Sequence, residues 1–156
     1  MLCRHEQEPV LELIATARDQ VSDPHESEAV ALKTTSMPAD RPVEEIVAAE
    51  QVRRDLMVVS CTSPLWAAAY TTNGGCSDDS FDYFRGWLIA PGREIFEHVV
   101  ADPGALAKLP AVQAAATAGI DLESEGMLLI AWNAHTTATG DQLPPGAPTI
   151  HYPLRG

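Results

Sequence analysis

Residues 66–93 gather the side chains that could do chemistry in this sequence. The segment holds two of the three Trp, two of the three Tyr and two of the three Phe. It also carries three carboxylates and a guanidinium at close spacing, Asp78, Asp79, Asp82 and Arg85. On a helix the three carboxylates lie near one edge, because residues three and four positions apart are neighbours. Burial beside aromatic rings would raise a carboxyl pKa towards the range that acid–base catalysis near neutral pH requires. The spacing therefore predicts a catalytic cluster in which Arg85 orients the substrate or stabilises an oxyanion.

The same four residues have a structural interpretation. Asp78 and Asp79 would lie in the first turn of a helix, where free N–H groups and the helix dipole favour negative charge. Asp82 and Arg85 have the spacing of an ion pair on the helix surface. Capping alone explains any one of these residues, but it needs one Asp and not three. The group as a whole favours a functional role.

Five further residues are predicted to bind a substrate beside this cluster. Aromatic rings from two helices would form the walls, and an acidic residue from the last helix would face the same pocket. The candidates are Trp66, Tyr70, Cys76, Trp87 and Glu123. Such aromatic rings more often pack in a core. A thiol just before a helix begins has a lowered pKa, but the neighbouring Asp residues oppose that shift, so a small packed cysteine is favoured at position 76.

Neither a metal nor a cofactor is predicted. Cys76 and the three Asp residues could offer a hard cation two or three carboxylates, but no recognised ligand spacing is present. A zinc site would need more Cys or His. The pair Gly74-Gly75 could let the backbone approach a phosphate, yet the acidic residues that follow would repel it.

The elements that position these residues are expected to be helices. Apolar periodicity and turn residues predict helices over about 9–20, 26–34, 42–61, 65–72, 78–90 and 93–100, one or two short helices within 105–118, and a last helix from an Asp121 cap to Gly140. A strand over 56–61 is a weaker alternative. Pro42 is expected at a first helical position, and Ser77 or Asp78 is expected to cap the helix that follows it. The predicted fold is all-α, a compact single-domain bundle of about six to eight helices over 1–140 with an extended Pro-rich tail over 141–156.

Composition limits the possible partners. The chain has 156 residues and a net charge of −12, with 22 acidic against 10 basic residues. Such a surface repels nucleic-acid phosphate and anionic lipid, so neither nucleic acid nor a membrane is expected as a partner. A small-molecule ligand or a basic protein fits better. Three Cys without a C-x-x-C pair, and no apolar leader at the first residues, indicate a cytoplasmic protein.

The central segment also resembles a known family. The run L-W-A-A-A-Y-x-x-N-G-G-C-S-D-D-x-F-D-Y-F-R-G-W-L-I-x-x-G-R is similar to the signature of a bacterial family common in actinomycetes, the 4240 domain of unknown function. The resemblance continues through D-P-G-A-L-A and E-S-E-G-M-L-L-I-A-W and covers about residues 60–135. Near the N-terminus, Val10 and Leu11 stand where the family has an aromatic pair. The resemblance implies a fold and the location of a site, but no activity.

Two functions from different classes follow. The first is a cofactor-free enzyme that acts on a small metabolite, of the hydrolase, isomerase or cyclase type. The alternative is a non-catalytic interaction or regulatory protein that presents an acidic face to a basic protein partner. An enclosed pocket beside Asp79 and Arg85 would favour catalysis, whereas an open acidic face would favour a partner.

Overall fold

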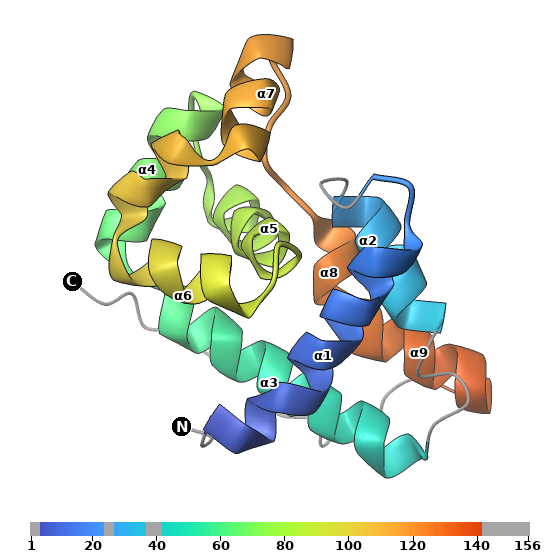
Figure 1. The fold of residues 1–156 in the computed structure, drawn as a ribbon. Helices are drawn as coiled ribbons and strands as arrows, with labels where there is room; N and C mark the ends of the chain where they lie inside the picture. Colours follow the sequence, from blue (N-terminus) through green and yellow to red (C-terminus); the bar gives the residue numbers. More distant parts are fainter. Residues whose placement is uncertain (1–3, 24–26, 37–41, 142–156) are drawn as a thin grey trace.

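A computed structural model describes residues 4–23, 27–36 and 42–141 of the chain (Figure 1). Within these residues every regular element is a helix and no β-strand occurs, which confirms the predicted all-α class. The described part has nine α-helices and one 3₁₀ helix, more than the six to eight that were expected. They are α1 (Arg4–Gln20), α2 (Ser27–Ser36), α3 (Val43–Ser60), α4 (Ser63–Asn73), α5 (Asp78–Ile89), α6 (Arg93–Ala101), the 3₁₀ helix η2 (Pro103–Lys108), α7 (Pro110–Ala118), α8 (Glu125–Leu128) and α9 (Ile130–Thr139). No described helix is long and apolar enough to cross a membrane.

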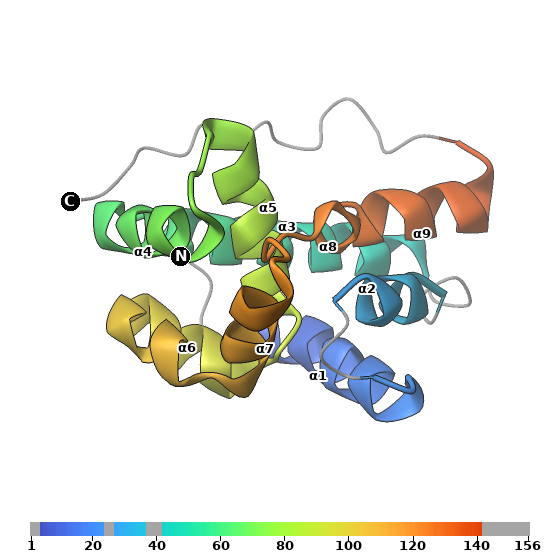
Figure 2. The same ribbon diagram turned by 90° about the horizontal axis from the view of Figure 1, so that it is seen from above.

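Helix α5 occupies the centre of the fold. It packs against α3, α4, α6 and α8. In Figure 1, α4, α6 and α7 lie on one side of α5, and α2, α8 and α9 lie on the other. Helix α3 passes beneath α5 in Figure 1. Figure 2 shows the fold from above, with α9 beside the part of α3 that lies away from α4. The second half of α5 is buried without interruption from Phe84 to Ile89, because partners surround it on every side. The first turn of α5 reaches the surface.

The turn between α4 and α5 forms as the sequence predicts. Gly74 ends α4 with a left-handed φ of 70°, a conformation that glycine adopts without strain. Ser77, one of the two expected caps, is the N-cap of α5, and its hydroxyl accepts a hydrogen bond from the Ser80 N–H at 3.2 Å. Asp78 is the first residue of α5 rather than its cap. Pro42 lies one position earlier than predicted, as the N-cap of α3.

The last predicted helix is wrong in two respects. Asp121 does not cap it, because residues 120–124 are not helical and Ser124 caps α8 instead, with its hydroxyl accepting from the Met127 N–H at 3.3 Å. The helical segment is also broken at Leu129, which separates α8 from α9. The cause is tertiary: the Ser124 N–H donates to the Tyr83 carbonyl at 2.9 Å, which holds this segment against α5. Gly140 ends α9 as predicted, with φ 75°.

Close backbone approach explains one glycine of α5. A Cβ added to Gly86 would lie 2.5 Å from the Ser124 carbonyl oxygen, so no other residue fits there without a shift of backbone. The approach brings the segment before α8 onto the central helix. The predicted tail over 141–156 lies outside the described residues except for Asp141.

Candidate functional site

Arg85 lies in the interior rather than in a pocket. Its side chain is 1% exposed, and its guanidinium donates to the Met57 carbonyl on α3 at 2.5 Å and to the Phe81 carbonyl at 3.4 Å. It also forms the predicted ion pair with Asp82, and its Cζ lies 4.6 Å from the centroid of the Phe81 ring. Each of its three nitrogens therefore has an acceptor within the protein. Arg85 joins α5 to α3.

The three Asp side chains lie above Arg85, at the surface. Asp78 and Asp79 are exposed in the first turn of α5. The Asp82 side chain is 40% exposed and uses one carboxylate oxygen for Arg85. The positive N-terminal end of the α5 dipole stabilises the carboxylates of Asp78 and Asp79. The residues predicted as a catalytic cluster thus form one exposed acidic edge and one inward-facing ion pair, and their catalytic role stays a prediction.

The aromatic candidates do not surround a single pocket. The Trp66 and Phe81 rings are stacked, with centroids 5.0 Å apart and an angle of 11° between the planes. The indole N–H of Trp66 donates to the Cys76 carbonyl at 3.1 Å, which fastens the turn before α5 onto α4. Tyr70, on α4, is 57% exposed. Trp87 is buried on α5, nearly two turns after Phe81. Trp66 and Cys76 therefore lie together near Arg85, on either side of the contacts made by Phe81, whereas Trp87 belongs to another part of the core.

The segment 121–125 brings two more carboxylates to α5. The Asn73 side chain binds both backbone groups of Leu122, accepting from its N–H at 3.0 Å and donating to its carbonyl at 3.4 Å. The backbone bond from Ser124 to Tyr83 follows immediately. Glu123 lies between these two anchors, and Glu125 begins α8 next to them. The sequence predicts Glu123 on the last helix, facing the site; this placement on a helix is wrong, because Glu123 precedes α8 in the non-helical segment.

Tyr83 lies among carboxylates from both segments. Its pKa is raised above the ordinary value for a phenol, chiefly by the charge of Glu125, then by desolvation and by the charges of Asp79, Glu123 and Asp82. Negative charge nearby disfavours the phenolate. We call the surface formed by these four carboxylates around Tyr83 the acidic face. Tyr83 was missed as a candidate, although its position four residues after Asp79 on a helix was a usable signal.

Cys76 borders the acidic face. Burial and the charge of Glu123 raise its thiol pKa above the ordinary value, and Arg85 opposes them with a smaller effect. A raised pKa leaves less thiolate at neutral pH, which is the opposite of an activated nucleophile. Burial, the first cause of the raised pKa, agrees with a small packed cysteine at this position.

Among the described residues, no group of three or more His, Cys, Asp or Glu side chains could hold a metal ion. Four cavities among the described helices are lined by residues other than the four predicted catalytic ones. Trp87 and Glu123 line one cleft together, on the side of α5 that faces α2 and α7.

Fold and surface together define an all-α protein with an acidic face on its central helix. The model of the family described as "Protein of unknown function (DUF4240)" matches residues 12–137, and the chain belongs to this family. The match begins within α1, so it extends well before the segment that carries the resemblance in the sequence. A search of curated proteins and a search of solved structures each found no match.

Proposed function

We propose that this protein is a non-catalytic binding protein whose acidic face takes a basic segment of a partner protein. The contact between two acidic segments carries this proposal: the Ser124 N–H donates to the Tyr83 carbonyl at 2.9 Å, which holds the segment with Glu123 and Glu125 against the part of α5 with Asp79 and Asp82. Lysine or arginine side chains of a partner would meet several negative charges at once. The same cations could lie over the ring of Tyr83, which is only half-buried.

The charges of the acidic face are largely uncompensated. Within the described residues, no Lys or Arg forms an ion pair with Asp79, Glu123 or Glu125. Asp82 alone has a cation, Arg85, which lies beneath it. The net charge of −12 adds a long-range field that would steer a basic partner towards the molecule. A face of this kind suits recognition by charge.

Catalysis by Asp78, Asp79, Asp82 and Arg85 has weaker support. An orienting or oxyanion-binding guanidinium needs N–H groups that point at the substrate. Those of Arg85 point at the Met57 carbonyl, the Phe81 carbonyl and Asp82, and the side chain is buried. A substrate would have to break these bonds to reach it. The geometry therefore favours binding over chemistry at this surface.

A matched pair of double variants tests the proposal. The probe is a ten-residue peptide of alternating Lys and Ser, titrated into the protein by calorimetry at low salt. Asp79→Asn with Glu123→Gln removes two charges from the acidic face. The control, Glu44→Gln with Glu94→Gln, removes two charges from the exposed first turns of α3 and α6.

The two double variants have the same net charge, so long-range attraction changes equally in both. We expect the Asp79/Glu123 variant to bind the peptide roughly tenfold more weakly than wild type, and the control to stay within about twofold. The affinity of wild type should fall as salt is raised, because exposed charges are screened. Equal losses in the two variants would reduce the effect to net charge and overturn the proposal.

A further inference from the structure

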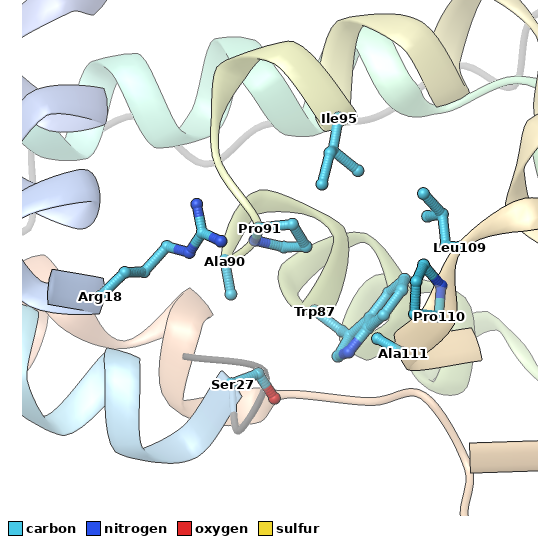
Figure 3. Close-up of a pocket in the computed structure, with 9 residues that line it drawn as sticks. All are labelled: Arg18, Ser27, Trp87, Ala90, Pro91, Ile95, Leu109, Pro110 and Ala111. Atoms are coloured by element: carbon cyan, nitrogen blue, oxygen red, sulfur yellow. The ribbon is translucent and has the colours of Figure 1, made fainter. Parts of the chain in front are cut away.

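A second candidate site lies beside Trp87 on α5, and Arg85 does not line it. A narrow cavity of about 50 Å³ is enclosed between α1, α5, α6 and the start of α7 (Figure 3). It adjoins a wider cleft of about 560 Å³ with which it shares Ser27, Trp87, Pro110 and Ala111. We call these two neighbouring spaces together the Arg18 cleft. Nothing in its lining belongs to the predicted catalytic cluster.

Arg18 presents a buried hydrogen-bond donor without an acceptor to this cleft. Its Nε is buried and has no hydrogen-bond partner, and Arg18 forms no ion pair with any described residue. Figure 3 shows the side chain reaching from α1 to Ala90 and Pro91 at the end of α5. A donor held out of water without an acceptor is unfavourable, and an anion in the cavity would remove that penalty.

The backbone next to Arg18 makes room for its guanidinium. Gly92 adopts a φ of +102°, and a Cβ built on it would lie 3.2 Å from Nη1 of Arg18. A larger residue would be strained by its backbone conformation and would also press against the guanidinium. Gly92 thus favours both the turn after α5 and the placement of the positive group.

The remaining walls of the cavity are apolar. Trp87 forms one wall, and Ile95, Leu109 and Pro110 surround the space beside it (Figure 3). A flat indole and aliphatic side chains give a surface on which an apolar or aromatic body can pack. Recesses with apolar walls and one oriented polar group are typical of small-molecule sites.

Charge limits the ligand to a single negative group. Arg18 is the one cationic side chain in the lining of either space, whereas the wider cleft carries Asp23, Glu28, Asp121 and Glu123. A second negative charge would face these carboxylates and be repelled. A carboxylate, with one charge and a planar fork that matches guanidinium, fits better than a doubly charged phosphate.

We propose that the Arg18 cleft binds a small monocarboxylate with an apolar or aromatic body. The carboxylate pairs with Arg18, and the body lies along Trp87. This site goes beyond the binding of a basic partner at the acidic face and does not depend on it. The two sites meet at Glu123, which belongs to the acidic face and also lines the wider cleft.

Phenylacetate is the probe for this site. It is titrated into the full-length protein and followed by the amide and indole resonances in heteronuclear NMR spectra. We expect saturable binding that shifts the indole resonance of Trp87, and at least tenfold weaker binding of phenylacetamide, which has the same body without the charge. Phenyl phosphate should also bind more weakly than phenylacetate.

Two variants with the same change in net charge complete the test. Arg18→Gln should weaken phenylacetate binding at least tenfold, whereas Lys33→Gln, on α2 and outside the lining, should leave it within twofold. Absence of saturable phenylacetate binding, or equal affinities for the acid and the amide, would overturn the proposal. The comparison of acid and amide uses wild type and stays decisive even if the Arg18 variant unfolds. Tighter binding of phenyl phosphate would overturn the assignment to a monocarboxylate.

Discussion

The side chain of Asn73 binds the backbone N–H and carbonyl of Leu122, which lies 49 positions away in the sequence. Asn73 is also the last residue of α4, immediately before the left-handed Gly74. Asn73 therefore ends α4 and also fixes the segment around Leu122 to that helix. This relationship, with the Ser124–Tyr83 backbone bond, places Glu123 and Glu125 beside α5 and so builds the acidic face.

Replacement of this anchor should loosen the acidic face. Asn73→Ala removes two hydrogen bonds from Leu122, and we expect the free energy of unfolding to fall by about 1–3 kcal/mol. Denaturant unfolding measures this change. Thr71→Ala, at an exposed position in the same helix, is the control and should alter stability by less than about 0.5 kcal/mol. Equal stabilities of the two variants would show that the Asn73 bonds contribute nothing to folding.

The titration of Tyr83 should report the charges around it. Asp79→Asn and Glu125→Gln should each lower the Tyr83 pKa towards its ordinary value, because both carboxylates now raise it. The pKa is read from near-ultraviolet absorbance as the difference between wild type and Tyr83→Phe. High salt should act in the same direction through screening. The same pKa in wild type and in Glu125→Gln would mean that Glu125 does not act on this phenol.

The sign of the stability change with pH follows from this shift. The folded protein holds the Tyr83 proton to a higher pH than the unfolded chain, because only the folded state gathers the carboxylates. The contribution of Tyr83 is therefore fully present below the unfolded pKa and is lost as pH rises through the folded pKa. The alkaline fall in unfolding free energy should be smaller in Tyr83→Phe.

Arg85 should behave as a structural residue. Arg85→Met leaves the Met57 carbonyl without its donor and Asp82, which is 40% exposed, without its cation, and we expect destabilisation of about 1–3 kcal/mol. Arg93→Gln is the control, because its ion pair with Glu97 is at the surface, and it should change stability by less than about 1 kcal/mol. A folded Arg85→Met protein of nearly wild-type stability would instead favour the catalytic hypothesis.

Glu50 is predicted to control stability in acid. It is 6% exposed, and its carboxylate accepts from Arg53 at 2.5 Å and from Arg54 at 2.8 Å. Burial alone would raise its pKa, but the hydrogen bonds and charges of the two arginines outweigh burial and hold the pKa below the ordinary value. The stability from this ionised group is present above the unfolded pKa and is lost as pH falls through the folded pKa.

Glu50→Gln should remove that acid dependence. Unfolding free energies measured from neutral pH down to about pH 3 should fall less steeply in the variant than in wild type. Glu44→Gln, at an exposed position in the same helix, should keep the wild-type slope. If Glu50→Gln and wild type lose stability in parallel, another group is responsible.

Local signals account for what the sequence predicts correctly. The Ser77 cap, the left-handed Gly74 and Gly140, and the Asp82–Arg85 pair each depend on residues within four positions of one another. Such spacings can be recognised without knowledge of the fold. The all-α class follows for the same reason, since helical periodicity is repeated in most segments.

Long-range contacts account for what the sequence does not predict. Asp121 looks like a cap, but the bond from Ser124 to the Tyr83 carbonyl keeps the chain extended until α8 begins. The sequence suggests that Arg85 is available to a substrate, but in the structure its guanidinium donates to the Met57 carbonyl, 28 positions away. The Arg18 cleft forms where α1, α5, α6 and the start of α7 meet beside the turn at Gly92, and no periodicity in the sequence encodes that meeting.

The central claim, that the acidic face around Tyr83 is the binding surface, is tested most directly by locating the bound peptide. Amide resonances of ¹⁵N-labelled protein are recorded during titration with the Lys–Ser peptide. The account predicts that the largest shifts fall on residues 78–83 and 122–125, which form and flank that face. Shifts spread evenly over all acidic residues, or largest at Glu44 and Glu94, would contradict it.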